Sequence, residues 1–257
     1  MGIWSRIKNA VKKVVKAVKK AAKWLWQKVK AFVRFIVRLI LTIVFAGIGI
    51  WDLLFGFLNW PPKKLTLHIF ILSDSNGPLI KVEEVTPAIN YARRVLKDRL
   101  SVTLRRYSKS FVEIIKAPAP SAALNAKECA LSGIFSDQIG DAGEYFAKHA
   151  AGWNAVPISL RFPITVFVIN DITGGYIGCS AGPFSEYVVV TTKGIRDNPA
   201  STMMHEIGHS CNIFGHGGTN ILDLMYANSR EGGNIRGDRV RGWQRNLIRC
   251  SRHVTYW

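Results

Sequence analysis

The amino-terminal residues place apolar and basic side chains on opposite sides of a helix. The basic residues Lys8, Lys12, Lys16, Lys19, Lys23 and Lys30 fall between apolar residues spaced at steps of three and four. At 3.6 residues per turn, this spacing gathers the apolar residues into one stripe: Ile3, Ile7, Val11, Val14, Val18, Ala22, Leu25, Val29, Phe32 and Ile36. The pattern predicts a basic amphipathic helix over residues 1–38. Its partner is an anionic lipid surface, the adjoining soluble domain, or a protein such as calmodulin.

The chain then becomes almost wholly apolar from Leu39 to Trp60, where only Thr42, Asp52 and Asn59 are polar. At about 1.5 Å per residue, 22 residues reach roughly 33 Å, which is enough to cross a bilayer core. Residues 39–60 are therefore predicted to span a membrane. The carboxylate of Asp52 leaves open a segment shifted to residues 32–51.

The charge distribution predicts an orientation for this span. Residues 1–38 carry 12 basic and no acidic side chains, whereas only two lysines closely follow Trp60. By the positive-inside rule, the amino terminus stays in the cytoplasm and the rest of the chain lies outside. We expect an uncleaved signal anchor, with a cleaved signal peptide as the alternative. Residues 61–64 begin with two prolines and are predicted to be a stiff connector.

Residues 65–257 alternate between strand-like and helical patterns. Strands are predicted over residues 65–72, 102–107, 111–116, 164–170 and 187–192, with a Gly-interrupted edge strand over 174–179. Helices are predicted to start near Thr86 and Asn198, and a further helix over 139–149. This order predicts an α/β domain with a mixed twisted sheet in three layers.

The net charge of +18 initially suggests nucleic-acid binding, but most of it lies in the amino-terminal helix. Beyond residue 38 only 23 basic residues face 17 acidic ones, an excess of 6. Arginines gather near the carboxyl terminus without interleaved stacking aromatics beyond Trp243, so we interpret them as a solvated face: Arg236, Arg239, Arg241, Arg245, Arg249 and Arg252. Nucleic acid is therefore not expected to be a partner.

The segment His205-Glu206-Ile207-Gly208-His209 is an HExxH motif. Two histidines at i and i+4 share one helical face and can bind one ion, while the glutamate can reach a water on that ion. His216 would lie about 10 Å further along an unbroken helix and could not reach the same ion. The chain must therefore turn back between Ser210 and Gly215, where Asn212 and Gly215 tolerate left-handed conformations.

These residues and the later Asp223-Leu224-Met225-Tyr226 resemble the metzincin clan of zinc endopeptidases. The clan pattern is HExxHxxGxxH followed by a turn that contains methionine. Here Asn212 stands in place of the glycine, and one more residue precedes the third histidine. The resemblance implies a metzincin-like fold over residues 65–257 with a zinc-binding active-site helix.

The resemblance also implies an activity, namely hydrolysis of protein or peptide substrates. One catalytic Zn²⁺ would be bound by His205, His209 and His216, with Asp223 as the alternative third ligand. Glu206 would act as general base, and Met225 would pack beneath the metal. A substrate strand would add to the edge strand near Tyr176, Ile177 and Gly178. A family-like carboxyl-terminal helix behind the zinc helix further suggests disulfides between Cys211 and Cys250 and between Cys129 and Cys179.

The sequence thus predicts a membrane-anchored zinc endopeptidase that acts outside the cytoplasm. A second interpretation is a membrane-active cationic effector whose protease-like domain is accessory or inactive.

Overall fold

The sheet is built around the longest strand, β1 (Lys63–Asp74), in a computed structural model that describes residues 3–130, 139–140, 142–150, 162–197, 200–217 and 220–256. β6 (Ile164–Ile169) runs parallel to β1, and β9 (Tyr187–Thr191) runs parallel to β6. β8 (Gly178–Ser180) is antiparallel to β9 and forms one edge of the sheet. β1 also pairs with β3 (Val102–Arg106), β4 (Val112–Pro118), β2 (Gly77–Pro78) and β12 (Val254–Thr255). The predicted mixed sheet is confirmed.

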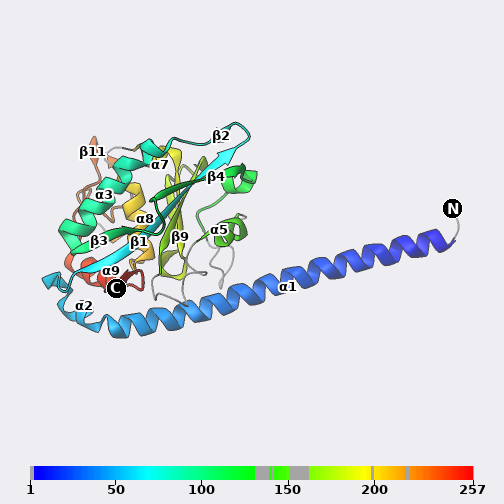
Figure 1. The fold of residues 1–257 in the computed structure, drawn as a ribbon, viewed down its shortest axis with the longest axis horizontal. Helices are drawn as coiled ribbons and strands as arrows, with labels where there is room; N and C mark the ends of the chain where they lie inside the picture. Colours follow the sequence, from blue (N-terminus) through cyan, green and yellow to red (C-terminus); the bar gives the residue numbers. More distant parts are fainter. Residues whose placement is uncertain are drawn as a thin grey trace.

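Helices cover both faces of this sheet, as Figure 1 shows. Successive side chains of β6 point to opposite faces, so Val166 and Val168 join one core and Phe167 and Ile169 join the other. The first core is closed by α3 (Val82–Leu100) and α8 (Thr202–Ser210). The second is closed by α4 (Ser121–Leu124) and α5 (Gly143–His149). The domain therefore has three layers, as the order of elements predicts.

Several predicted boundaries differ from the structure. α3 begins at Val82 rather than near Thr86, because the Lys81 backbone N–H donates to Glu84 Oε1 (2.9 Å) and caps the helix a turn earlier. The helix predicted over 139–149 is α5, which begins at Gly143, and part of that range lies outside the described residues. The edge strand is shorter than predicted, since Tyr176 and Ile177 precede β8.

The remaining elements are short. They are α7 (Thr192–Arg196), α9 (Gly242–Arg249), η2 (Gly182–Phe184), the β5/β7 pair (Asn125–Ala126 and Asp171–Ile172) and the β10/β11 pair (Arg230–Glu231 and Asn234–Ile235).

The amino-terminal residues form one helix, α1 (Ile3–Ile48), that passes along the domain and continues well beyond it (Figure 1). The chain turns at Gly49, where a Cβ would lie 2.9 Å from Cys250 Cβ, so only glycine fits this close approach. Two short helices follow, α2 (Ile50–Phe55) and η1 (Gly56–Leu58). This differs from the single segment predicted over 39–60, because residues beyond Gly49 pack on α9: Asn246 Nδ2 donates to the Leu53 carbonyl (2.8 Å).

Asp52, the polar interruption of the predicted span, is fully buried in the domain. Its carboxylate accepts hydrogen bonds from Lys63 Nζ (2.7 Å), Arg249 Nε (2.8 Å) and Tyr256 Oη (2.7 Å). A buried carboxylate requires such partners, because desolvation of an unpaired charge is very costly. We call these four residues the Asp52 network.

A second buried ion pair joins α1 itself to the domain. Arg38 Nε donates to Glu186 Oε1 (2.8 Å), and Arg252 Nη1 reaches the same oxygen (3.3 Å). Around this pair, Phe35 packs on Phe184 and Phe45 packs edge-on against Phe162. The terminal arginines are therefore not all a solvated face: Arg249 and Arg252, like Arg236, are buried, because each binds partners inside the domain.

Among the helices of the described residues, only α1 is long and apolar enough to cross a membrane, over Val11–Ile48. This finding rests on length and composition, which a membrane anchor and a signal sequence share.

Candidate metal centre

The first two histidines of the motif are held on one face of α8. His205 and His209 are one turn apart, and their Nε2 atoms lie 3.2 Å from each other. The Nδ1 atom of His205 bonds the Leu224 carbonyl (2.8 Å), and that of His209 bonds the Ile213 carbonyl (2.9 Å). Because a carbonyl oxygen only accepts hydrogen bonds, each Nδ1 carries the proton and each Nε2 presents a lone pair.

His216 reaches this face because the chain reverses after the helix. α8 ends at Ser210, and Asn212 (φ 70°) and Gly215 (φ 66°) adopt the left-handed conformations predicted for them. The His216 ring stacks on the His205 ring with centroids 5.2 Å apart, and it lies edge-on to His209 at 5.1 Å. One ligand atom from each of the three histidines lies within 4.8 Å of the others.

This donor set fits a metal ion. Two nitrogen lone pairs 3.2 Å apart repel each other unless a cation lies between them. Tetrahedral Zn–N bonds of about 2.0–2.1 Å separate two ligand nitrogens by roughly 3.3 Å. Burial lowers the pKa of His205 well below its ordinary value, and it lowers those of His209 and His216 as well, which favours the neutral form that binds metals. The cluster could therefore hold a metal ion.

Glu206 lies beside the cluster and lines the same cavity. Burial raises the pKa of its carboxyl to about 8, although the nearby Arg236 guanidinium acts in the opposite direction. The side chain packs against β8: a Cβ on Gly178 would lie 2.7 Å from Glu206 Oε1. A glycine at position 178 thus lets the edge strand approach the carboxylate closely.

The other two predicted site residues have different environments. Met225 is buried and lies against α8, where a Cβ on Gly208 would be 2.6 Å from its sulfur. Asp223 is also buried, but its carboxylate accepts hydrogen bonds from Arg239 Nε (2.5 Å) and Arg241 Nη2 (2.7 Å). The structure therefore brings His216 to the cluster and engages Asp223 elsewhere.

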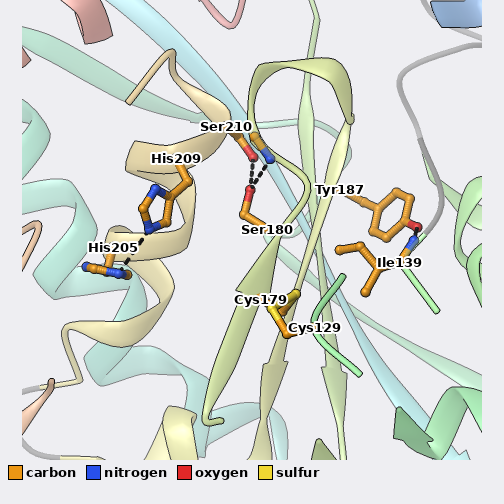
Figure 2. The surroundings of a disulfide bond; sticks show 9 residues. Cys129, Ile139, Cys179, Ser180, Tyr187, His205, His209 and Ser210 are labelled. Carbon is orange, nitrogen blue, oxygen red and sulfur yellow. Dashed lines mark hydrogen bonds between the residues drawn. A yellow bond between two sulfur atoms is a disulfide. The ribbon is translucent and has the colours of Figure 1, made fainter. Parts of the chain in front are cut away.

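The three histidines and Glu206 open into a cavity of about 740 Å³. The predicted substrate-strand residues Tyr176, Ile177 and Gly178 form part of its wall, and β8 is the edge of the sheet at this point. Ser180 of β8 bonds Ser210 at the end of α8 (Oγ to Oγ, 3.0 Å), which fixes the edge strand to the histidine helix (Figure 2).

A disulfide joins a cavity-lining residue to β8. Cys129 lines the cavity and is bonded to Cys179 of β8 (Figure 2), which confirms one of the two expected pairings. The other pairing is wrong: Cys211 and Cys250 are free and buried. Cys250 is instead packed against Gly49, and its sulfur bonds the Leu247 carbonyl (3.3 Å).

Arg236 is a cavity residue that the sequence did not reveal. Its guanidinium is buried and donates to Ser201 Oγ (3.1 Å), Thr202 Oγ1 (3.2 Å) and the Tyr226 carbonyl (3.0 Å), which joins the start of α8 to the segment after Met225. In the sequence it is one of many carboxyl-terminal arginines, and no spacing rule separates it from them.

No protein-family profile matches the chain, and no curated protein matches it. Among solved structures, the chain is similar to metalloproteinase-II from Bacteroides fragilis, at 15% identity and a TM-score of 0.47 over 73% of this chain and 53% of that one. It is also similar to a chain in a chaperone–substrate complex, at 15% identity and a TM-score of 0.43 over 74% of this chain and 35% of that one. The chain thus spans about half or less of these two structures, and neither likeness defines its function.

Proposed function

We propose that this protein is a zinc-dependent endopeptidase held at a membrane by its amino-terminal helix. The observation that carries the proposal is the pair of unprotonated Nε2 atoms 3.2 Å apart, with His216 closing the third side and Glu206 adjacent. Three histidines with an open fourth position are typical of catalytic rather than structural zinc.

The residues around the cluster have distinct roles in this reaction. Zinc, when bound, supplies a Lewis acid that acidifies water and polarises a carbonyl. Glu206 would ionise beside a bound cation, which lowers the pKa of its carboxyl, so that Glu206 would accept the proton of the attacking water and later donate it to the leaving amine. His205 and His209 are kept in the ligating tautomer by the carbonyls of Leu224 and Ile213, which keep Nδ1 protonated.

In this proposal the substrate binds by pairing with the edge strand β8. An extended peptide that pairs with β8 passes the Glu206 carboxylate, because Gly178 and Glu206 are in close approach. Backbone pairing of this kind binds peptides largely independently of their side chains. The proposed substrate is therefore an extended segment of a protein or peptide.

Metal content is the first test, made on the full chain. We expect one zinc per chain in the wild type and none at stoichiometric level in His205→Ala, because two of three ligands do not hold the ion. The matched control is His149→Ala, since His149 lies on α5 and bonds the Tyr145 carbonyl (2.8 Å). Equal zinc in all three proteins would refute the site.

Hydrolysis is the second test. Glu206→Gln keeps the shape of the side chain but removes the base, so we expect full zinc content and a loss of kcat of about 100-fold or more on a protein substrate. The control is Glu83→Gln, which changes an exposed carboxylate in the first turn of α3. Unchanged turnover in Glu206→Gln would contradict the assigned role.

A further inference from the structure

α1 presents two different faces where it lies on the domain. Ala31, Arg38 and Phe45 are the buried residues of this stretch, and they are seven residues apart. Seven residues are close to two helical turns, so the three side chains point in one direction, toward the domain.

The opposite face is an exposed apolar stripe. Two side chains that are two residues apart on an α-helix point in directions about 200° apart around the helix axis. Val29, Ile40 and Ile43 each lie two residues from one of the buried residues, and all three are exposed. The stripe continues along the part of α1 that extends beyond the domain, through Val11, Val14, Val18, Leu25 and Phe32, which are exposed as well.

Most of the basic residues lie on the domain side of the helix. Lys20 precedes Arg38 by 18 residues, or five turns, so it points in the direction of the domain rather than of the stripe. Lys13 and Lys16 lie within about 40° of the same direction. One continuous helix therefore has an apolar side along its length, with most of its charges and the folded domain on the other side.

Both ends of the apolar stretch are fixed to the domain. Arg38 is held by Glu186 at one end, and Asp52 is held by Lys63 and Arg249 at the other. A helix that crossed the bilayer through residues 39–60 would leave these charges buried without their partners. The exposed stripe, by contrast, can enter a lipid surface with every one of these bonds intact.

We propose that the folded protein lies on an anionic bilayer with α1 in the plane of the membrane, its apolar stripe among the lipids and its domain on the same side as its amino terminus. Charge complementarity identifies the partner, because residues 1–38 carry 12 basic and no acidic side chains. The proposal deepens the membrane attachment in the proposed function and is independent of hydrolysis.

The orientation is tested with the full chain, tagged at both ends and added to preformed vesicles. Vesicles of phosphatidylcholine with phosphatidylglycerol are compared with vesicles of phosphatidylcholine alone. We expect binding to the anionic vesicles, release by high salt, and removal of both tags by external protease. Protection of the amino-terminal tag alone would overturn the in-plane orientation while leaving membrane attachment intact. Failure to bind either vesicle would overturn the attachment itself.

The stripe is tested by a matched pair of variants. Val29→Ser/Ile43→Ser removes two exposed aliphatic side chains from the stripe, and Leu222→Ser/Ile235→Ser removes two from elsewhere on the domain. We expect vesicle partitioning to weaken about tenfold or more in the first variant only, with equal melting temperatures in both. Equal weakening in both would overturn the proposal. So would concentration-dependent self-association that only the stripe variant loses, since the stripe would then bind a second copy of the chain.

Discussion

At the scale of single residues, Gly208 is where the histidine helix and the segment containing Met225 come closest. A Cβ at this position would lie 2.6 Å from the Met225 sulfur, well inside van der Waals contact. Gly208 lies between Glu206 and His209 in α8, so a displacement of Met225 would disturb the helix that carries His205 and His209.

We therefore expect Gly208→Ala to destabilise the chain by about 1–3 kcal/mol through overpacking, and to weaken zinc binding. Gly47→Ala is the control, because it replaces a glycine in α1 whose added Cβ meets nothing within 4 Å. That change should stabilise the helix by about 0.5–1 kcal/mol. Urea unfolding and a zinc titration of both variants measure these effects. A Gly208→Ala chain as stable as the wild type would mean that Met225 moves freely.

The residues of the candidate site differ in how far the sequence predicts them. The positions of His205, His209 and the turn before His216 follow from helical geometry and from residue types that tolerate positive φ. Arg236 does not follow, because its role depends on hydroxyl groups of Ser201 and Thr202 that are 35 and 34 residues away. A contact between residues this far apart in the chain leaves no local pattern in the sequence.

At the scale of elements, the contact between α1 and the domain centres on one carboxylate. Glu186 is buried with Arg38 and Arg252, while a second link, from Gln27 to Glu144 (2.8 Å), is exposed. The buried ion pair and the exposed hydrogen bond contribute very differently to the free energy of unfolding. Only loss of the buried pair leaves desolvated charges without a partner.

We expect Glu186→Gln to lower the free energy of unfolding by about 3–5 kcal/mol, since two guanidinium groups lose their counter-charge. Glu144→Gln should change it by no more than about 0.5 kcal/mol. Both are measured by urea unfolding of the full chain. Similar losses in the two variants would show that α1 does not depend on the buried pair.

The disulfide ties the segment around Cys129 to the edge strand across 50 residues of chain. Alkylation of the denatured, non-reduced protein should label only Cys211 and Cys250. Removing the bridge in Cys129→Ser/Cys179→Ser should lower the free energy of unfolding by roughly 4 kcal/mol, because the unfolded chain gains conformational entropy without it. Dithiothreitol should destabilise the wild type and leave the double variant unchanged. Four labelled cysteines in the wild type would contradict the bridge.

The sequence predicted the elements of the domain better than it predicted the environment of the amino-terminal helix. Period-2 and period-3.6 patterns locate strands and helices because each element buries one face. The same periodicity does not tell whether an apolar stripe contacts lipid or protein. Asp52 shows this limit: it interrupts a predicted span because it is bound by Lys63 and by Arg249, and Arg249 is 197 residues away in the sequence.

At the scale of the whole molecule, residues before β1 are part of the folded domain. α1 supplies Arg38 to Glu186, and α2 (Ile50–Phe55) supplies Asp52 to its network. We expect a fragment of residues 61–257 to be insoluble or unfolded. Lys63 and Arg249 would be buried without Asp52, and Glu186 would keep Arg252 but lose Arg38.

A chain that lacks only residues 1–26 is the control, since it keeps the contacts from Gln27 onward. It should unfold at the same urea concentration as the full chain. Circular dichroism and urea unfolding distinguish the two truncations. A 61–257 fragment with wild-type stability would mean that the domain folds without the amino-terminal helix.

The buried charges also predict acid sensitivity. Burial alone would raise the pKa of Glu186, but Arg38 and Arg252 outweigh it and hold the pKa at about 2, below the ordinary 4.5. Burial, together with Arg252, lowers the pKa of His253 to about 3 from 6.5. In both cases the unfolded chain binds a proton at a higher pH than the folded chain.

Stability should therefore fall as pH drops from about 6.5 toward 3 through His253, and from about 4.5 toward 2 through Glu186. Thermal unfolding at several pH values measures this, with a chelator present so that loss of metal does not contribute. His253→Gln should reduce the slope of stability against pH between about 6.5 and 3, while the contribution of Glu186 between about 4.5 and 2 remains. A flat profile from pH 6.5 to 4.5 would contradict the buried neutral His253.

The bridge between Cys129 and Cys179 makes one wall of the cavity sensitive to the redox state of the compartment that holds the protein. Thiols stay reduced in the cytosol, so the covalent tether would be absent there and would form in an oxidising compartment. The tether joins Cys129 to β8 and includes none of the three histidines. The redox state of the compartment would therefore act on the wall of the cavity, while the three candidate ligands of the metal centre stay the same in both states.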